Sequence, residues 1–322
     1  MRELIHGLLD WVYPPRCMSC RNPLPLQNKR GRGLWLCSYC ENLFQPLDGP
    51  GCVICSGPLK QQGVDDDYGF VHDVTDDYQD FGRDRIDDRH RHEQKEIIEP
   101  YSLEQSVLDF LSKIDEEKTD DKKPTHSTAA KPPHPQTCAS CRSRTFHFTH
   151  NRALFAYEDL VRDLIRDIKF RQRKHIAEGL GRLWGELAAK QIPAGTMLVP
   201  LPMHKKKRRK RGFDQAEILA KALSAATGAI YTPILERTQN TPPQSGLHPR
   251  QRAENVRGAF RIKPDHNANG QNYILIDDIY TTGASLNECA RVLKAGGAAE
   301  VSAMTLAIAI KKEKPYSEGA AH

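Results

Sequence analysis

The chain alternates short apolar runs with amphipathic stretches from residue 152 to residue 310, and this alternation limits its possible folds more than any other feature. The apolar runs have the length of buried strands, and apolar residues in the stretches between them recur every three or four positions. The expected strands are 152–157 (RALFAY), 196–202 (TMLVPLP), 272–278 (NYILIDD) and 301–310 (VSAMTLAIAI); the expected helical segments are 160–190, 213–227 and 285–298. This order predicts an α/β fold, in which a parallel sheet is covered by helices on both faces.

Eight of the nine cysteines form four CxxC pairs, and the first two pairs predict a metal site. Sixteen residues separate Cys20 from Cys37, which matches the spacing of four thiolates around one zinc ion. Disulfides are the alternative, but they need an oxidising compartment, and no export signal is visible. We therefore expect structural zinc at Cys17, Cys20, Cys37 and Cys40.

The third and fourth CxxC pairs predict a second structural zinc ion, at Cys52, Cys55, Cys138 and Cys141. The 82 residues between these pairs do not forbid the site, because the entropy of loop closure grows slowly with loop length. A cross-braced pairing of the four CxxC units remains the alternative, so one or two zinc ions are expected. Cys289 stands alone in an expected helix and is interpreted as a packed thiol.

The composition changes sharply after the third CxxC pair. Residues 65–123 hold 20 Asp or Glu against 9 Lys or Arg, whereas the whole chain has a formal charge of +6. The segment is therefore expected to be disordered, apart from helical spacing at 103–114 that predicts either a partner-binding helix or a transient one. The strongly basic remainder indicates an anionic ligand such as phosphate or nucleic acid, or a soluble surface with uneven charge. The expected organisation is an amphipathic helix and zinc module (1–59), an acidic disordered insertion (60–136), the second half of the zinc module (137–150), the α/β domain (151–311) and a disordered tail (312–322).

The stretch YILIDDIYTTGAS, residues 273–285, predicts a ligand site. Its acidic pair is expected at the carboxyl end of a parallel strand, where ligands of such sheets bind. The residues after the pair turn into a helix, whose N-terminal N–H groups favour a phosphate. The acids would suit two neighbouring hydroxyl donors, so the pattern predicts a ribose 5-phosphate unit. The alternative, an ordinary strand and helix with one acid capping the turn, leaves the second acid unexplained.

This stretch resembles the phosphoribosyl pyrophosphate motif of type I phosphoribosyltransferases, and further matches narrow the resemblance to the ComF/GntX family. They include LVPLP followed by RGFDQAEILA, RTQNTPPQSGLHPRQRAENVRGAF, DIKFRQRKHIAEGL and the CxxC series. The resemblance covers about residues 11–59 and 136–310 and implies a type I phosphoribosyltransferase-like sheet flanked by helices, with a small N-terminal cysteine-rich zinc module. It departs from the family in the acidic insertion and in Asp214, where relatives commonly carry Asn.

The resemblance also implies roles for individual residues. Asp277 and Asp278 would contact the ribose hydroxyls, and the region 204–211, with Lys205 and Arg211, would meet pyrophosphate together with Mg²⁺. The segment 244–257 is similar to a mobile loop that closes over the site. The loop expected to hold the 5′-phosphate consists of Thr281, Thr282, Gly283, Ala284 and Ser285.

Two basic segments leave alternatives open. KKKRRKR, residues 205–211, holds more charge than pyrophosphate needs, so it indicates single-stranded DNA, an import signal or a solvated loop. Lys169 and Arg171, at the expected end of a helix, would either help to hold phosphate or form salt bridges.

The expected function is binding of phosphoribosyl pyrophosphate with Mg²⁺, and the expected enzymatic class is a phosphoribosyltransferase, a glycosyltransferase acting on an unidentified acceptor. The resemblance implies a role in competence and DNA uptake, with single-stranded DNA and competence proteins as partners. The alternative is a non-catalytic module that binds single-stranded DNA or a protein partner. No catalytic residue is assigned. No run of about 18 apolar residues is present, and a cytoplasmic location is expected.

Overall fold

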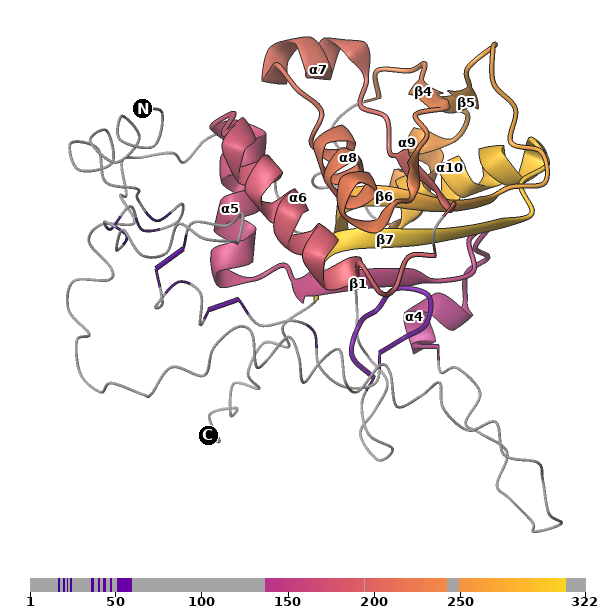
Figure 1. Cartoon of the computed structure of the whole chain (residues 1–322). Helices are drawn as coiled ribbons and strands as arrows, with labels where there is room; N and C mark the ends of the chain where they lie inside the picture. Colours follow the sequence, from indigo (N-terminus) through magenta and orange to yellow (C-terminus); the bar gives the residue numbers. More distant parts are fainter. Residues whose placement is uncertain are drawn as a thin grey trace, which may run out of the picture.

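The computed structural model describes residues 51–59, 137–193, 195–241 and 249–310, together with single positions before residue 48: 17, 20, 22, 24, 36, 37, 40, 43, 44 and 47. Within these residues the main element is a five-stranded sheet with the order β1-β7-β6-β2-β3, in which every neighbouring pair is parallel (Figure 1). From edge to edge its strands are β1 (Asn151–Ala156), β7 (Glu300–Ile308), β6 (Asn272–Tyr280), β2 (Met197–Pro200) and β3 (Ile230–Tyr231). The expected parallel α/β sheet is confirmed.

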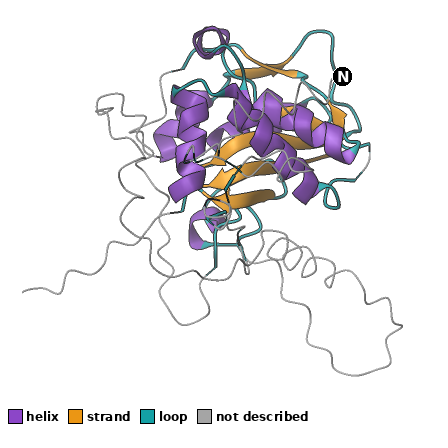
Figure 2. Ribbon diagram, turned by 60° about the vertical axis from the view of Figure 1, so that its left-hand side comes forward, coloured by secondary structure: helices purple, strands orange, loops and turns teal. Residues whose placement is uncertain are grey.

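Helices cover both faces of this sheet (Figure 2). The helices of one face are α5 (Asp159–Phe170), α6 (Lys174–Ala188) and α8 (Gln215–Thr227), and α10 (Ala284–Ala295) packs on the other. The central strand β6 supplies both cores, because successive side chains of a strand point to opposite faces. Ile274 and Ile276 lie in the core with α5, α6 and α8, whereas Tyr273 and Leu275 lie in the core with α10.

The expected helical segment 160–190 forms two helices, and the first ends at Phe170, beside the expected helix end at Lys169 and Arg171. The helical conformation is interrupted at residues 171–173, where Gln172 adopts a positive φ of 55°. Beyond the break, α6 packs closely on α8, and a Cβ atom on Gly185 would lie only 2.6 Å from the Cβ atom of Ala226. Glycine therefore allows these two helices to approach each other.

The basic run is helical, which corrects its interpretation as a loop. It forms α7 (Lys205–Arg211). The N-cap of this helix is His204, and its C-cap is Gly212, whose φ is 84°. The ring nitrogen Nδ1 of His204 accepts a hydrogen bond from the Lys206 N–H at 3.2 Å. The two caps provide hydrogen-bond partners for backbone groups at the ends of α7. They stabilise the helix although its like charges repel one another.

The structure also contains elements that the sequence patterns did not predict. An antiparallel pair consists of β4 (Leu235–Arg237) and β5 (Phe260–Ile262). Two short helices are α4 (Ala139–Arg142) and α9 (Pro249–Val256), the second of which falls within the expected mobile segment 244–257.

The cysteine-rich module covers the free edge of β1. The Leu47 N–H donates to the carbonyl of Leu154 at 3.0 Å, and the Asn151 N–H donates to the carbonyl of Val53 at 3.2 Å. Ser56 adds a hydroxyl hydrogen bond to the carbonyl of Asn151 at 2.6 Å. Unpaired strand edges are prone to associate with other chains, so this cover protects the sheet as well as anchoring the module.

Several expectations fall on residues outside those the structure describes. They are the N-terminal amphipathic helix, the acidic insertion with its helical spacing at 103–114, residues 244–248 and the tail 312–322. Of the helices that are described, none is both long and apolar enough to cross a membrane.

Candidate functional site

The loop between β6 and α10 lies at the carboxyl edge of the parallel sheet. β6 continues through Tyr280, two residues beyond its expected end, and α10 begins at Ala284. Gly283 is the N-cap of α10, and as a glycine it has no side chain to cap this helix end. The first-turn N–H groups and the helix dipole therefore create a favourable position for an anion.

Gly283 is required by the geometry of this loop. Its φ of 69° lies in the left-handed region, which side chains disfavour. A Cβ atom at this position would also lie 2.5 Å from the hydroxyl oxygen of Tyr280, a fully buried residue. Both observations indicate that any other residue would displace the loop.

The hydroxyl groups of the loop are not equivalent. Thr281 and Ser285 are partly exposed, whereas Thr282 is buried and its Oγ1 accepts a hydrogen bond from the Ala284 N–H at 3.4 Å. Solvent therefore reaches Thr281 and Ser285, whereas Thr282 stabilises the turn itself.

Asp278 is held by side chains from two helices on one face of the sheet. Its carboxylate forms an ion pair with Lys169 of α5 at 2.9 Å and accepts a hydrogen bond from Gln215 of α8 at 3.4 Å. Arg211, the last residue of α7, donates to Gln215 at 2.6 Å. The structure thus brings Arg211 into the network around the acidic pair, whereas Lys205 is exposed at the other end of α7. Lys169 forms a salt bridge, one of the two roles left open for it.

The two acids differ in their electrostatic environments. Burial and the neighbouring charge of Asp278 raise the pKa of Asp277 well above its ordinary value. Burial also opposes ionisation of Asp278, but the ammonium group of Lys169 outweighs it, so the pKa of Asp278 is lowered. Asp278 therefore ionises readily, whereas ionisation of Asp277, which would add a second negative charge to the pair, is opposed. A ligand that donates hydrogen bonds would stabilise that second charge.

Asp214 fits the turn in which it lies. It is the N-cap of α8, and its two carboxylate oxygens accept hydrogen bonds from the Ala216 N–H at 3.1 Å and the Met203 N–H at 3.0 Å. An amide side chain has a single acceptor oxygen for these two donors. These two hydrogen bonds hold the turn between α7 and α8.

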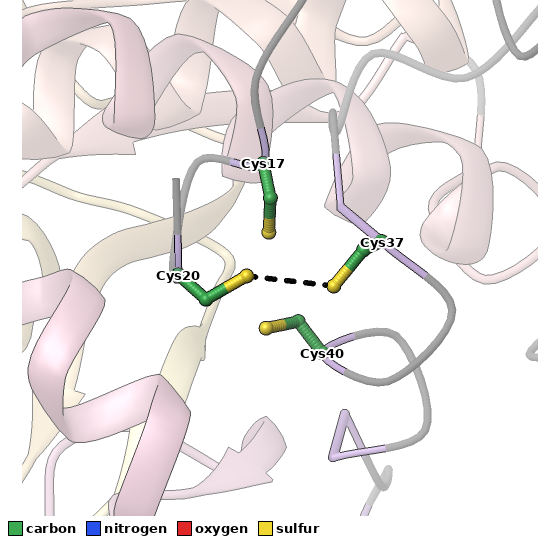
Figure 3. A group of neighbouring side chains, drawn as sticks. All are labelled: Cys17, Cys20, Cys37 and Cys40. Carbon is green, nitrogen blue, oxygen red and sulfur yellow. Dashed lines mark hydrogen bonds between the residues drawn. The ribbon is translucent and has the colours of Figure 1, made fainter. Parts of the chain in front are cut away.

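The cysteines form two clusters, and the structure pairs the CxxC units in chain order. Cluster I consists of Cys17, Cys20, Cys37 and Cys40 (Figure 3), and cluster II of Cys52, Cys55, Cys138 and Cys141. In each cluster the sulfur atoms lie within 4.8 Å of one another. The Cys20 and Cys37 sulfurs are 3.5 Å apart, and those of Cys55 and Cys138 are 3.9 Å apart. These distances suit four thiolates around one zinc ion, since Zn–S bonds of about 2.3 Å in a tetrahedron place sulfurs about 3.8 Å apart.

The surroundings of the clusters also suit a structural metal. Burial raises the pKa of Cys20 to about 11, so a bound cation is needed to favour its thiolate. In cluster II, the Cys138 N–H lies 3.3 Å from the sulfur of Cys52, and the Gly57 N–H lies 3.3 Å from that of Cys55. N–H donors of this kind orient and stabilise thiolate ligands. Four thiolates leave no open position for water, so both sites are structural.

Two contributors to the site were not assigned roles by sequence reasoning. Gln215 lies in the quoted motif RGFDQAEILA, which could have drawn attention to it. Arg144 donates a hydrogen bond to the carbonyl of Thr282 at 2.7 Å across 138 positions of the chain. No local pattern signals a contact over such a separation.

Two family models match the chain: a phosphoribosyl transferase domain over residues 209–321 and a double zinc ribbon domain over residues 8–68. The first range contains Arg211, the acidic pair and the loop that follows it. The second contains all of cluster I and half of cluster II.

Similar proteins have been named for competence and DNA utilization. The chain is 33% identical to competence protein ComFC of Bacillus subtilis (strain 168), over 48% of this chain and 63% of the relative. It is 30% identical to DNA utilization protein YhgH of Salmonella typhi, over 44% of this chain and 65% of the relative. The chain is 27% identical to competence protein F of Haemophilus influenzae (strain ATCC 51907 / DSM 11121 / KW20 / Rd), over 53% of this chain and 78% of the relative. The chain thus spans less than two thirds of the first two relatives. The chain thus combines a parallel phosphoribosyltransferase-type sheet with an N-terminal module of two cysteine clusters, and over about half its length it is similar to the ComF-type competence proteins.

Proposed function

We propose that the site at the carboxyl end of β6 binds phosphoribosyl pyrophosphate together with Mg²⁺. The observation that carries this proposal is the order of groups along one segment: two acids near the end of a parallel strand, followed by a helix N-terminus whose N-cap is Gly283. The helix N-terminus suits the 5′-phosphate, and the acids suit the two ribose hydroxyls. A phosphate and a diol joined by one sugar fit this arrangement better than either group alone.

The pyrophosphate end of the ligand is proposed to lie towards α7. Arg211 reaches the network of the acidic pair through Gln215, so one guanidinium group is near the position where a pyrophosphate would complete the ligand. Mg²⁺ would bridge pyrophosphate oxygens and keep several of its waters, as this ion prefers. The match of the phosphoribosyl transferase domain, which includes Arg211 and Asp278, supports the same assignment.

We extend this proposal to transfer of the phosphoribosyl group to an unidentified acceptor, with pyrophosphate leaving from the anomeric carbon. Positive charge would develop on the ribose ring and negative charge on the leaving pyrophosphate. The residues around Asp278 and Arg211 would therefore act by positioning and electrostatic stabilisation.

A ligand series tests the binding proposal by calorimetric titration in the presence of Mg²⁺. Phosphoribosyl pyrophosphate should bind most tightly, ribose 5-phosphate more weakly, and 2-deoxyribose 5-phosphate about tenfold more weakly again. The last step reflects one lost hydrogen bond to a charged acceptor, about 1.5 kcal/mol. Equal affinity for the two sugar phosphates would reject the acidic pair as the diol site, and no heat with phosphoribosyl pyrophosphate would reject the proposal.

A second proposal is that α7 binds single-stranded DNA. Its first six residues are all exposed Lys or Arg, and Arg208 forms an ion pair with Glu217 at 2.8 Å. The relatives' names, which refer to competence and DNA utilization, favour DNA as the polyanion.

Charge neutralisation on α7 tests the DNA proposal. Changing Lys205, Lys206 and Arg209 to Gln should weaken binding of an oligonucleotide at least tenfold and lower the slope of log affinity against log salt by about 2, since each phosphate contact contributes about 0.7. Arg211 is left intact so that the sugar-phosphate site is not disturbed. The control changes Arg152 and Lys190 to Gln, towards the opposite edge of the sheet. Equal losses in both variants would indicate that overall charge, not α7, attracts DNA.

A further inference from the structure

The segment that follows cluster II is bound directly to the loop between β6 and α10. The guanidinium group of Arg144, three residues after the cluster II ligand Cys141, donates to the carbonyl of Thr282 at 2.7 Å. Its carbon atom also lies 4.9 Å from the ring centre of Phe146, a position typical of a cation–π contact. Arg144 is therefore held on one side by an aromatic ring while it holds the loop on the other.

The same segment also grips the first turn of α10. The His147 N–H donates to the side-chain oxygen of Asn287 at 2.6 Å, and the Asn287 amide donates to the carbonyl of Thr145 at 3.1 Å. Together with the bond from Arg144, three hydrogen bonds join residues 144–147 to the loop and to the helix that follows it. A loop with this many fixed points has few alternative conformations.

The bond to Thr282 orients the next N–H group. The carbonyl of Thr282 and the N–H of Gly283 belong to one planar peptide unit and point in opposite directions. When Arg144 holds the carbonyl on its own side, the Gly283 N–H is directed away from Arg144. This N–H group stands at the N-cap of α10, where an anion would be received.

Buried side chains also connect cluster II to the loop. Tyr280 lies in one buried core with Cys52, Cys55 and Cys141, and its hydroxyl lies beneath Gly283. Two cysteines of cluster I, Cys17 and Cys40, belong instead to the core on the other face of the sheet. The two clusters are therefore not equivalent in their contact with the loop.

We propose that cluster II fixes the conformation of the loop of residues 281–285 through Arg144, a positioning residue, and that cluster I does not. Metal at cluster II holds Cys138 and Cys141 together, which sets the course of the chain from Cys141 to Arg144 and hence the position of the guanidinium group. The role of this loop in phosphate binding rests on the function proposed above. The coupling itself concerns the protein without ligand.

Hydrogen exchange of the ligand-free protein tests the coupling independently of the ligand. Arg144→Met, which keeps an unbranched side chain but removes the donors, should speed exchange in peptides covering residues 281–290 about tenfold, because a charged hydrogen bond is lost. Arg144→Lys, which keeps one donor group, should restore part of the protection. Arg142→Met, an exposed neighbour, serves as the control and should leave the exchange unchanged. Wild-type exchange in a folded, fully metal-loaded Arg144→Met protein would overturn the proposal.

A matched pair of cysteine variants tests which cluster acts on the loop. Cys138→Ser in cluster II should speed exchange at residues 281–290, and Cys20→Ser in cluster I, a cysteine with similar exposure, should not. Equal effects of the two substitutions would overturn the proposal. If Cys138→Ser does not fold, the Arg144 variants still decide the matter.

Titration with phosphoribosyl pyrophosphate then separates the two proposals. Loss of affinity in Arg144→Met, with recovery in Arg144→Lys, supports both. Faster loop exchange in Arg144→Met, combined with no binding even to the wild type, supports the coupling and rejects the proposed ligand. Equal binding and equal exchange in the wild type and Arg144→Met support the ligand and reject the coupling.

Discussion

The double substitution Asp277→Asn and Asp278→Asn should lower the affinity for phosphoribosyl pyrophosphate with Mg²⁺ by about 100-fold or more. Each ribose hydroxyl would lose its charged acceptor, and hydrogen bonds to charged groups contribute about 1.5–3 kcal/mol. Two such losses together correspond to at least about two factors of ten in the dissociation constant. Calorimetric titration of the folded variant measures the effect.

The single variants should separate binding from stability. Asp278→Asn removes the ion-pair partner of Lys169 and leaves its largely buried ammonium group without that direct contact. Breaking a buried ion pair in this way costs about 3–5 kcal/mol, and partial exposure of Lys169 places the expected loss at the lower end. Asp277→Asn should cost much less stability, because burial already disfavours the charged form of that side chain.

The pH dependence of stability follows from the same contacts. The pKa of Asp278 is lower in the folded chain than in the unfolded chain. Its contribution to stability is therefore fully present above the unfolded pKa of about 3.9 and is lost as the pH falls through the folded pKa. Asp278→Asn should remove this part of the acid dependence.

Two controls make the binding result decisive. Asp265→Asn removes an exposed acid outside the strand that carries the pair and should leave the affinity unchanged. Lys169→Met in the Asp278→Asn background removes the unbalanced charge and should recover part of the stability without recovering binding. A double Asp variant that is folded and binds as tightly as the wild type would exclude the acidic pair as the ribose site.

Loss of either metal cluster is the second change for which we expect a large effect. The wild type should contain two zinc ions per chain, Cys17→Ser or Cys52→Ser should reduce the content to one, and the combined variant should contain none. Loss of a structural metal is one of the few changes that lower the free energy of unfolding by more than about 4–5 kcal/mol. At about 2–4 °C per kcal/mol for a domain of this size, each single variant should lower the melting temperature by roughly 10–20 °C.

Metal analysis and thermal unfolding on the same samples measure these effects. Cys289→Ser is the matched control, because Cys289 is equally buried but lies outside both clusters. It should keep two zinc ions. A full metal content in Cys17→Ser or Cys52→Ser would show that the affected cluster is not the metal site, and a wild type without zinc would refute both assignments.

The sequence alone determined those features that depend on neighbouring residues. Alternation of apolar runs and amphipathic stretches specified the parallel sheet with helices on both faces, because each face of a strand and each apolar helix stripe must be buried. The spacing of Cys17, Cys20, Cys37 and Cys40 specified a cluster, since two CxxC units with a suitable separation can surround one ion. The order of acids, threonines and glycine after residue 276 likewise indicated one ligand site.

Other features depended on contacts between residues far apart in the chain. The helical conformation of the basic run and the pairing of β4 with β5 arise from packing and capping that override local preferences. The role of Lys169 likewise depends on the tertiary structure, which places its ammonium group 2.9 Å from the carboxylate of Asp278.

The relation between cluster II and the loop after β6 is the clearest case of this difference. CxxC spacing predicted the cluster, and the YILIDDIYTTGAS pattern predicted the loop, but neither pattern contains information about the other. Arg144 and Thr282 are 138 positions apart, and they meet because α10 and cluster II share one face of the sheet. The sequence thus specified the two sites through local spacing, and only the tertiary structure joined them, because the strand order and the packing on each face decide which distant side chains come into contact.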